Sequence, residues 1–92
     1  MANFILTYDL NGSHPSHAEM DEHLEKIGAA RARILESVWY VGAMTTRDDL
    51  TAYVRRILSP NDRLIVAEAK DASFVYLLVP DQWLIDAWNY YR

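Results

Sequence analysis

Asp9 is the residue of this sequence best suited to chemistry, because a carboxylate follows directly on an apolar segment, residues 4–8. Mg²⁺ binds through one or two carboxylates together with water and phosphate oxygens, and Mn²⁺ accepts the same hard ligands. A metal held at Asp9 could activate a water molecule for hydrolysis. The competing interpretation is structural: Asp9 would hydrogen-bond the Asn11-Gly12 turn that follows it.

Arginines form the second group of candidates, because guanidinium groups on one surface can neutralise the phosphates of a nucleic acid. The whole chain has a net charge of −4, which does not favour sequence-independent nucleic-acid binding. Residues 31–56, however, hold five arginines against three acidic residues. In the alternative, these arginines pair with neighbouring carboxylates and leave no net patch. The predicted nucleic-acid contacts are Arg31, Arg33, Arg47, Arg55 and Arg56.

Other kinds of site lack the residues they need. The chain has no cysteine, which excludes disulfides and thiolate zinc sites. It has three glycines and no Gly-x-Ser-x-Gly segment, so neither a glycine-rich phosphate loop nor a serine nucleophile is indicated. His17 and Asp21 have a spacing that a metal could bridge on a helix, but no third ligand follows. We therefore predict that the histidines lie on the surface.

Aromatic residues gather in the last twenty positions, where their spacing predicts a helix over 81–92. Such a helix could pack inward and cover the edge of a sheet. Alternatively, its tryptophans and tyrosines could form a contact surface for another protein. A dimer interface would satisfy both interpretations. The predicted interface residues are Trp83, Trp88 and Tyr91.

Hydrophobic periodicity and capping residues predict the elements that position these candidates. Phe4, Leu6 and Tyr8 alternate as in a central strand, and Ser16 with Glu19 fits the capping box of an amphipathic helix. The predicted elements are a strand over 3–10, a helix from Ser16 to Gly28, one long strand over Arg33–Ala43 with a bend or bulge near Ser37, a helix from Thr46 to Ser59, a strand over Arg63–Ala69, an apolar segment over 73–79 that fits a strand or a buried helix, and a helix over Asp81–Arg92.

This order predicts an α+β fold, a ferredoxin-like (split βαβ) sandwich with two helices on one face of a small antiparallel sheet. The first and third predicted strands should lie next to each other at the sheet centre. We expect a single domain over 1–92, with a core over 3–69 and a C-terminal helical tail over 70–92.

Three segments together resemble Cas-two, the small adaptation endonuclease of CRISPR systems. They are Thr7-Tyr8-Asp9-Leu10 at the end of the first strand, Arg33–Trp39 with its Ser-Val-aromatic run, and Ile57–Val66, which joins a helix end, an acidic turn and a strand. The resemblance covers residues 3–69. The VapD-like ribonucleases are a second, more distant family of similar fold.

The resemblance implies a ferredoxin-like homodimer in which Asp9 faces its twin, so that the pair holds one Mg²⁺ or Mn²⁺. It also implies an endonuclease on DNA or RNA, or a scaffold on which DNA lies without being cut. Two features depart from the family pattern. The loop at 11–15 and the acidic helix replace the basic residues that often follow its Tyr-Asp motif, and the tail 70–92 matches no motif.

Two functions follow from these observations. The first is a Cas-two-like homodimer that binds nucleic acid and cleaves it with a metal at Asp9. The second is a non-catalytic protein-interaction module on the same fold, working through the aromatic tail or as an acidic inhibitor that mimics nucleic acid. No apolar run approaches the length of a membrane span, and no signal peptide is recognisable, so we expect a cytoplasmic protein without a membrane partner.

Overall fold

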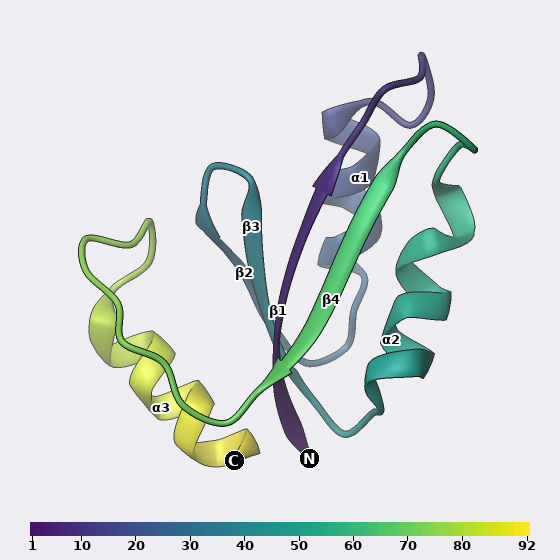
Figure 1. Ribbon diagram of the computed structural model, residues 1–92. Helices are drawn as coiled ribbons and strands as arrows, with labels where there is room; N and C mark the ends of the chain where they lie inside the picture. The colour runs from purple at the N-terminus through teal and green to yellow at the C-terminus, as the bar shows by residue number, and fades with distance from the viewer.

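The computed structural model describes residues 1–92, and its four strands form one sheet between two layers of helix (Figure 1). Helices α1 and α2 cover one face of the sheet, and α3 lies against the other. The predicted α+β class is therefore confirmed, with a four-stranded antiparallel sheet and three helices. The elements are β1 (Ala2–Asp9), α1 (His17–Glu25), β2 (Ala30–Leu35), β3 (Val38–Ala43), α2 (Arg47–Val54), the 3₁₀ turn η1 (Arg55–Ile57), β4 (Arg63–Ala69) and α3 (Asp81–Tyr91).

The strands lie in the order β2-β3-β1-β4, and every neighbouring pair is antiparallel. Strand β1 is central: its Leu6 is opposite Trp39 of β3 on one side and Val66 of β4 on the other. The predicted adjacency of the first strand and the strand at 63–69 is confirmed. Of these two, only β1 lies at the centre, because β4 forms an edge of the sheet.

The prediction of one long strand over Arg33–Ala43 is wrong. The segment folds back on itself at Glu36–Ser37, so that β2 and β3 form a hairpin in which Leu35 is opposite Val38. Two-residue hairpin turns are usually signalled by glycine, asparagine or aspartate, and this turn has none of them. The sequence warnings were the length, since eleven residues is about twice the ordinary length of a strand, and the bend predicted near Ser37, where the turn lies.

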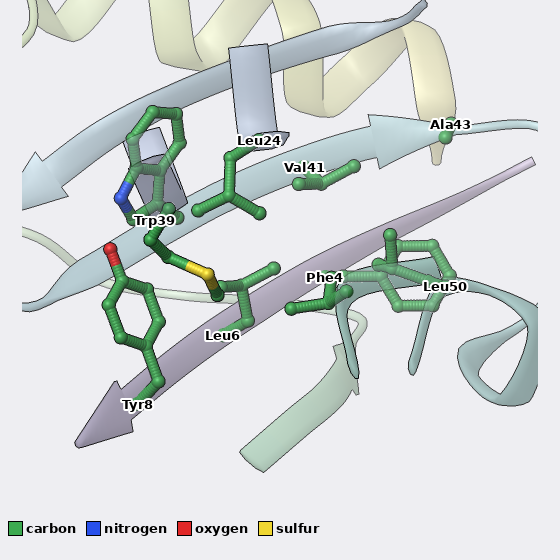
Figure 2. Packing of buried hydrophobic residues seen from close by; sticks show 10 residues of the cluster. Phe4, Leu6, Tyr8, Leu24, Trp39, Val41, Ala43 and Leu50 are labelled. Atoms are coloured by element: carbon green, nitrogen blue, oxygen red, sulfur yellow. The ribbon is translucent and has the colours of Figure 1, made fainter. Parts of the chain in front are cut away.

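The larger core lies between the sheet and the first two helices (Figure 2). Alternate residues of each strand point to the same face, and residues three or four apart on each helix point back at them. This core therefore follows the predicted periodicity. Its buried side chains are Phe4, Leu6 and Tyr8 of β1, Trp39, Val41 and Ala43 of β3, Met20 and Leu24 of α1, and Leu50 and Val54 of α2.

Both predicted helix starts are confirmed. The Ser16 hydroxyl accepts a hydrogen bond from the Glu19 amide, and the Glu19 carboxylate accepts one from the Ser16 amide, completing the capping box. The Thr46 hydroxyl caps α2 in the same way, accepting from the Asp49 amide. The helices end earlier than the sequence predicted, α1 at Glu25 and α2 in the turn η1.

The second core lies on the opposite face of the sheet, beneath α3. Its buried members are Ile34, Tyr40, Leu84 and Trp88. A buried polar link joins helix to sheet: the Asn3 side-chain amide donates to the Trp88 carbonyl at 3.0 Å, and the Tyr40 hydroxyl donates to the Asn3 side-chain oxygen at 2.6 Å. The predicted C-terminal helix is therefore confirmed, and it packs on its own chain.

The apolar segment 73–79 forms neither of the predicted alternatives. It is an irregular loop that follows β4 and leads into α3. Phe74 and Leu77 pack against the second core, whereas Tyr76 points outward, so the apolar residues serve two sides without a regular period. The amide of Leu78 donates to the Ile34 carbonyl at 3.0 Å, which holds the loop beside β2. Along the whole chain, no helix has the length and apolar character that crossing a membrane requires.

Candidate functional site

Asp9 ends the central strand β1 and points to the sheet face opposite α1 and α2, on which α3 packs. Successive strand residues point to opposite faces, and Tyr8 belongs to the core under α1, so Asp9 points the other way. Its cross-strand partner is Arg63 of β4, and the guanidinium lies 4.0 Å from the carboxylate. The Asp9 side chain is 69% exposed, so this ion pair holds it only weakly. The carboxylate is therefore free to meet a ligand.

The turn after β1 is held by Asp62, not by Asp9. The Asp62 carboxylate accepts hydrogen bonds from the Asn11 amide at 2.8 Å and from the Ser59 amide at 2.7 Å. These donors favour the charged form and hold the pKa of Asp62 below its ordinary value. The Asn11 side chain adds a bond to the Asn61 carbonyl at 3.0 Å. The structural role that the sequence offered for Asp9 thus belongs to Asp62.

Asp9 belongs to no group of three or more potential metal ligands in its own chain. No group of three or more acidic or histidine side chains in the structure could hold a metal ion. A metal at Asp9 would therefore take its remaining ligands from water, from a nucleic-acid phosphate or from a second copy of the chain.

The predicted nucleic-acid arginines occupy two separate places. Arg31 and Arg33 lie on the edge strand β2, where both pair with acidic residues of α1. Arg31 lies 3.4 Å from Glu25, and Arg33 is bonded to Asp21. Their charge is thus neutralised within the chain, as the alternative interpretation expected.

The other three arginines belong to α2 and η1, near the opposite edge strand β4. Arg47 pairs with Asp48 at 3.2 Å. Arg56 lies over the ring of Tyr53, with 5.3 Å between guanidinium and ring centre, and neither it nor Arg55 contacts a carboxylate. The structure therefore does not gather the five arginines into one patch, and it leaves only Arg55 and Arg56 without an acidic partner.

The aromatic tail is divided between core and surface. Trp88 is 6% exposed, and its indole N–H donates to the Lys70 carbonyl at 2.9 Å, so it belongs to the second core. Trp83 is partly exposed and packs edge-on against Tyr40. Tyr91 is half-buried beside Tyr90. Of the three predicted interface residues, only Trp83 and Tyr91 present surface.

Sequence reasoning missed a polar cluster beneath α1. Burial raises the pKa of the Tyr8 hydroxyl, and the nearby Asp21 carboxylate raises it further. The Tyr8 hydroxyl and the indole nitrogen of Trp39 point toward each other in Figure 2. Arg33 lies 5.7 Å from the Trp39 ring and links the cluster to Asp21. Four different elements supply these residues, so no local spacing could have signalled the cluster.

Sequence reasoning also missed a group of exposed apolar side chains on the loop between β4 and α3. Val75, Tyr76 and Leu78 are 70%, 94% and 60% exposed. The segment looked like a buried element because it is continuously apolar, and an irregular backbone is what turns part of it outward.

Comparison with known proteins adds no relative, because no family model, no curated protein and no solved structure matches this chain.

Proposed function

We propose that this chain is a homodimeric, ferredoxin-like nucleic-acid-binding protein of the Cas-two kind, acting in the cytoplasm as an endonuclease with Mg²⁺ or Mn²⁺ at Asp9. One observation carries the proposal. The Asp9 carboxylate stands exposed at the end of the central strand, on the face of the sheet that α3 covers only in part, and makes no hydrogen bond within the chain.

The order of the elements supports the ferredoxin-like part of the proposal. The chain runs β-α-β-β-α-β before its tail, and the sheet order is β2-β3-β1-β4. Each helix of the first six elements connects two strands that lie on either side of a third, which is the split βαβ arrangement. The added helix α3 covers only part of the second face, since the exposed Ile65 of β4 points to the same face.

The position of Asp9 supports the metal and dimer parts. A second copy packed on the part of this face that α3 leaves uncovered would bring a second Asp9 to the first, and two carboxylates with water and phosphate oxygens suit Mg²⁺. The metal would lower the pKa of its bound water and neutralise the leaving oxygen of a phosphodiester. Arg63 would then leave Asp9 and become available to a phosphate.

The test is a cleavage and gel-shift assay on DNA and RNA, comparing wild type with Asp9→Ala in Mg²⁺, Mn²⁺ or EDTA. We expect metal-dependent cleavage by the wild type and a loss of at least about 100-fold in the variant, because a metal supplies several kcal/mol of transition-state stabilisation. The matched control is Glu36→Gln, which removes one exposed carboxylate from the hairpin turn. Folded Asp9→Ala that cleaves as fast as wild type would contradict the catalytic role.

The second candidate is a non-catalytic protein-interaction module on the same fold. The pairing of Arg31 and Arg33 with the acidic helix α1 favours it, because that pairing removes positive charge from the nucleic-acid surface. Fluorescence anisotropy with a labelled duplex separates the two candidates. It is measured at about 50 and about 200 mM salt, because affinity that depends on phosphate contacts changes steeply over this range. Tight binding that weakens steeply with salt would rule out the interaction module, and no binding at either salt would rule out the first proposal.

A further inference from the structure

An apolar pocket of about 350 Å³ opens between the sheet, the loop after β4 and α3. Its walls include Ile5 of β1, Val38 of β3, Phe74 of the loop and Trp88 of α3. Ten of its 11 lining residues are hydrophobic, and the exception is Ser73. The pocket has the size at which small ligand sites begin, and one aromatic side chain would fill much of it.

Exposed apolar side chains surround this pocket. Leu35 and Val75 line it while remaining 45% and 70% exposed, and Leu78 beside them is 60% exposed. Between them Tyr76 is 94% exposed, although the residues on either side of it line the pocket. A large aromatic side chain that is exposed to water beside an apolar pocket is available to bind a partner.

The backbone holds Tyr76 in this outward position. Its φ is 57°, in the left-handed region that costs a non-glycine residue free energy. The neighbouring Phe74 and Leu77 are packed on the second core, and the Leu78 amide is bonded to Ile34. The strained residue is thus fixed from both sides, and its side chain is presented at a defined place.

The partner is identified by the absence of charge on this surface. Residues 72–79 carry no charged side chain, whereas the chain as a whole has a net charge of −4. Such a surface offers no charge to the phosphates of a nucleic acid or to a basic or acidic peptide. It does carry both an aromatic anchor and an apolar pocket, and a symmetric dimer needs just such a self-complementary pair.

We propose that Tyr76 of one copy inserts into the apolar pocket of a second copy, and that the second copy returns the contact around a two-fold axis. This inference rests on the proposed homodimer and names its contact. The pocket lies on the same sheet face as Asp9, because Ile5 and Asp9 are alternate residues of β1. Ser73 would meet the Tyr76 hydroxyl, which needs a hydrogen-bond partner when buried.

The area available fits a weak dimer. With about 200 Å² for a fully exposed large side chain, the four rim residues expose on the order of 500 Å² per copy. Two copies would bury about 1,000 Å², which is at the low end for specific interfaces. We therefore expect a dimer with a dissociation constant in the micromolar range.

The test is sedimentation equilibrium of wild type and Tyr76→Asp without metal or nucleic acid. We expect the wild type to dimerise and the variant to dissociate at least about 100-fold more readily, since the anchor is lost twice in a symmetric dimer. The matched control is Tyr90→Asp, the same change at an exposed tyrosine of α3 that does not line the pocket. It should change the constant less than about 3-fold. Far-UV circular dichroism checks that both variants are folded.

A second pair of variants tests the reciprocal contact itself. Ser73→Trp fills the pocket and leaves Tyr76 in place, so this variant alone should be monomeric. Mixed with Tyr76→Asp, it should form heterodimers, because one tyrosine and one open pocket then remain to meet. Monomeric wild type at about 1 mM, or a mixture that stays monomeric while each variant is folded, would overturn the proposal.

The dimer test and the nuclease test can fail independently. Asp9→Ala should dimerise as the wild type does, because Asp9 does not line the pocket. Metal-dependent cleavage by a protein that dimerises without Tyr76 would overturn this contact and leave the proposed function intact. Dimerisation through Tyr76 by a protein that binds no nucleic acid would support this contact and overturn the proposed nucleic-acid function.

Discussion

At the scale of single residues, the carboxylates of Asp9 and Asp62 lie near one end of the sheet and have different roles. Asp62 is committed to the loops, since its oxygens accept the backbone amides of Asn11 and Ser59. Asp9 is held only by the exposed pair with Arg63. Substitution of Asp62 should therefore change stability, whereas substitution of Asp9 should change what the protein binds.

Asp62→Asn should lower the melting temperature at pH 7. Its backbone donors hold the pKa below the ordinary value of 3.8, so the charged carboxylate stabilises the fold above that pH. The stabilisation is lost as the pH falls through the folded-state pKa. The difference in melting temperature between wild type and variant should therefore be largest near neutral pH and should disappear as the pH falls below about 4.

Thermal melts from pH 7 to pH 2 measure this gap. Asp71→Asn is the control, because Asp71 is an exposed carboxylate whose only contact is an ion pair with Arg92 at 3.5 Å. A gap for Asp62→Asn that does not change with pH would mean that the charge of Asp62 contributes nothing to the fold.

At the scale of elements, α3 is the addition that decides which surfaces remain. It packs so closely on β3 that position 42 has room for glycine but not for a side chain. A Cβ atom at Gly42 would lie 2.3 Å from the Tyr40 hydroxyl oxygen and 2.6 Å from the Tyr91 ring. Both neighbours belong to the seam between the sheet and the helix, so a side chain there would push them apart.

Gly42→Ala should therefore destabilise the protein by about 1–3 kcal/mol, the usual cost of overpacking a core. The displaced α3 should also expose Trp88, which would shift tryptophan emission to longer wavelength. Gly28→Ala is the matched control, since no atom lies within 4 Å of its added Cβ, and it should be close to neutral. Equal stability of the two variants in urea titrations would show that α3 does not need this close approach.

At the scale of the whole molecule, two cores share one sheet. The odd-numbered residues of β1 face the second core and the even-numbered ones face the first, so neither core can open without disturbing the strand between them. The molecule should therefore unfold in one cooperative transition, as small single domains usually do.

Leu84→Ala tests this coupling from the α3 side. Leu84 is 2% exposed in the second core, so the substitution should cost about 2–4 kcal/mol. The urea unfolding curves from circular dichroism and from tryptophan emission should still coincide, because the two cores unfold together. Tryptophan emission reports both cores, since Trp39 lies in the first and Trp88 in the second. Ile85→Ala, 40% exposed on the same helix, should cost less than about 1 kcal/mol. Two separated transitions would show that α3 melts as an independent unit.

Local signals in the sequence determined much of this fold. The alternation of Phe4, Leu6 and Tyr8 predicted β1, and the capping residues Ser16 and Thr46 predicted the starts of two helices, since these interactions span a few residues. The same local reasoning identified Asp9 as a residue at the end of a strand. The alternation also predicts the side to which Asp9 points, because a residue next to buried Tyr8 must face the opposite side of the sheet.

Contacts between distant residues decided the rest. The turn at Glu36–Ser37 has no glycine, asparagine or aspartate, so it is the pairing of β2 with β3 that sets the hairpin. Asp62 replaces Asp9 as the cap of a turn 51 positions away, and Arg33 meets Asp21 across the space between a strand and a helix. In the loop at 73–79, contacts with α3 and the sheet decide which side chains are buried and which are exposed to solvent. Such outcomes depend on which elements meet in space, and no spacing along the chain encodes them.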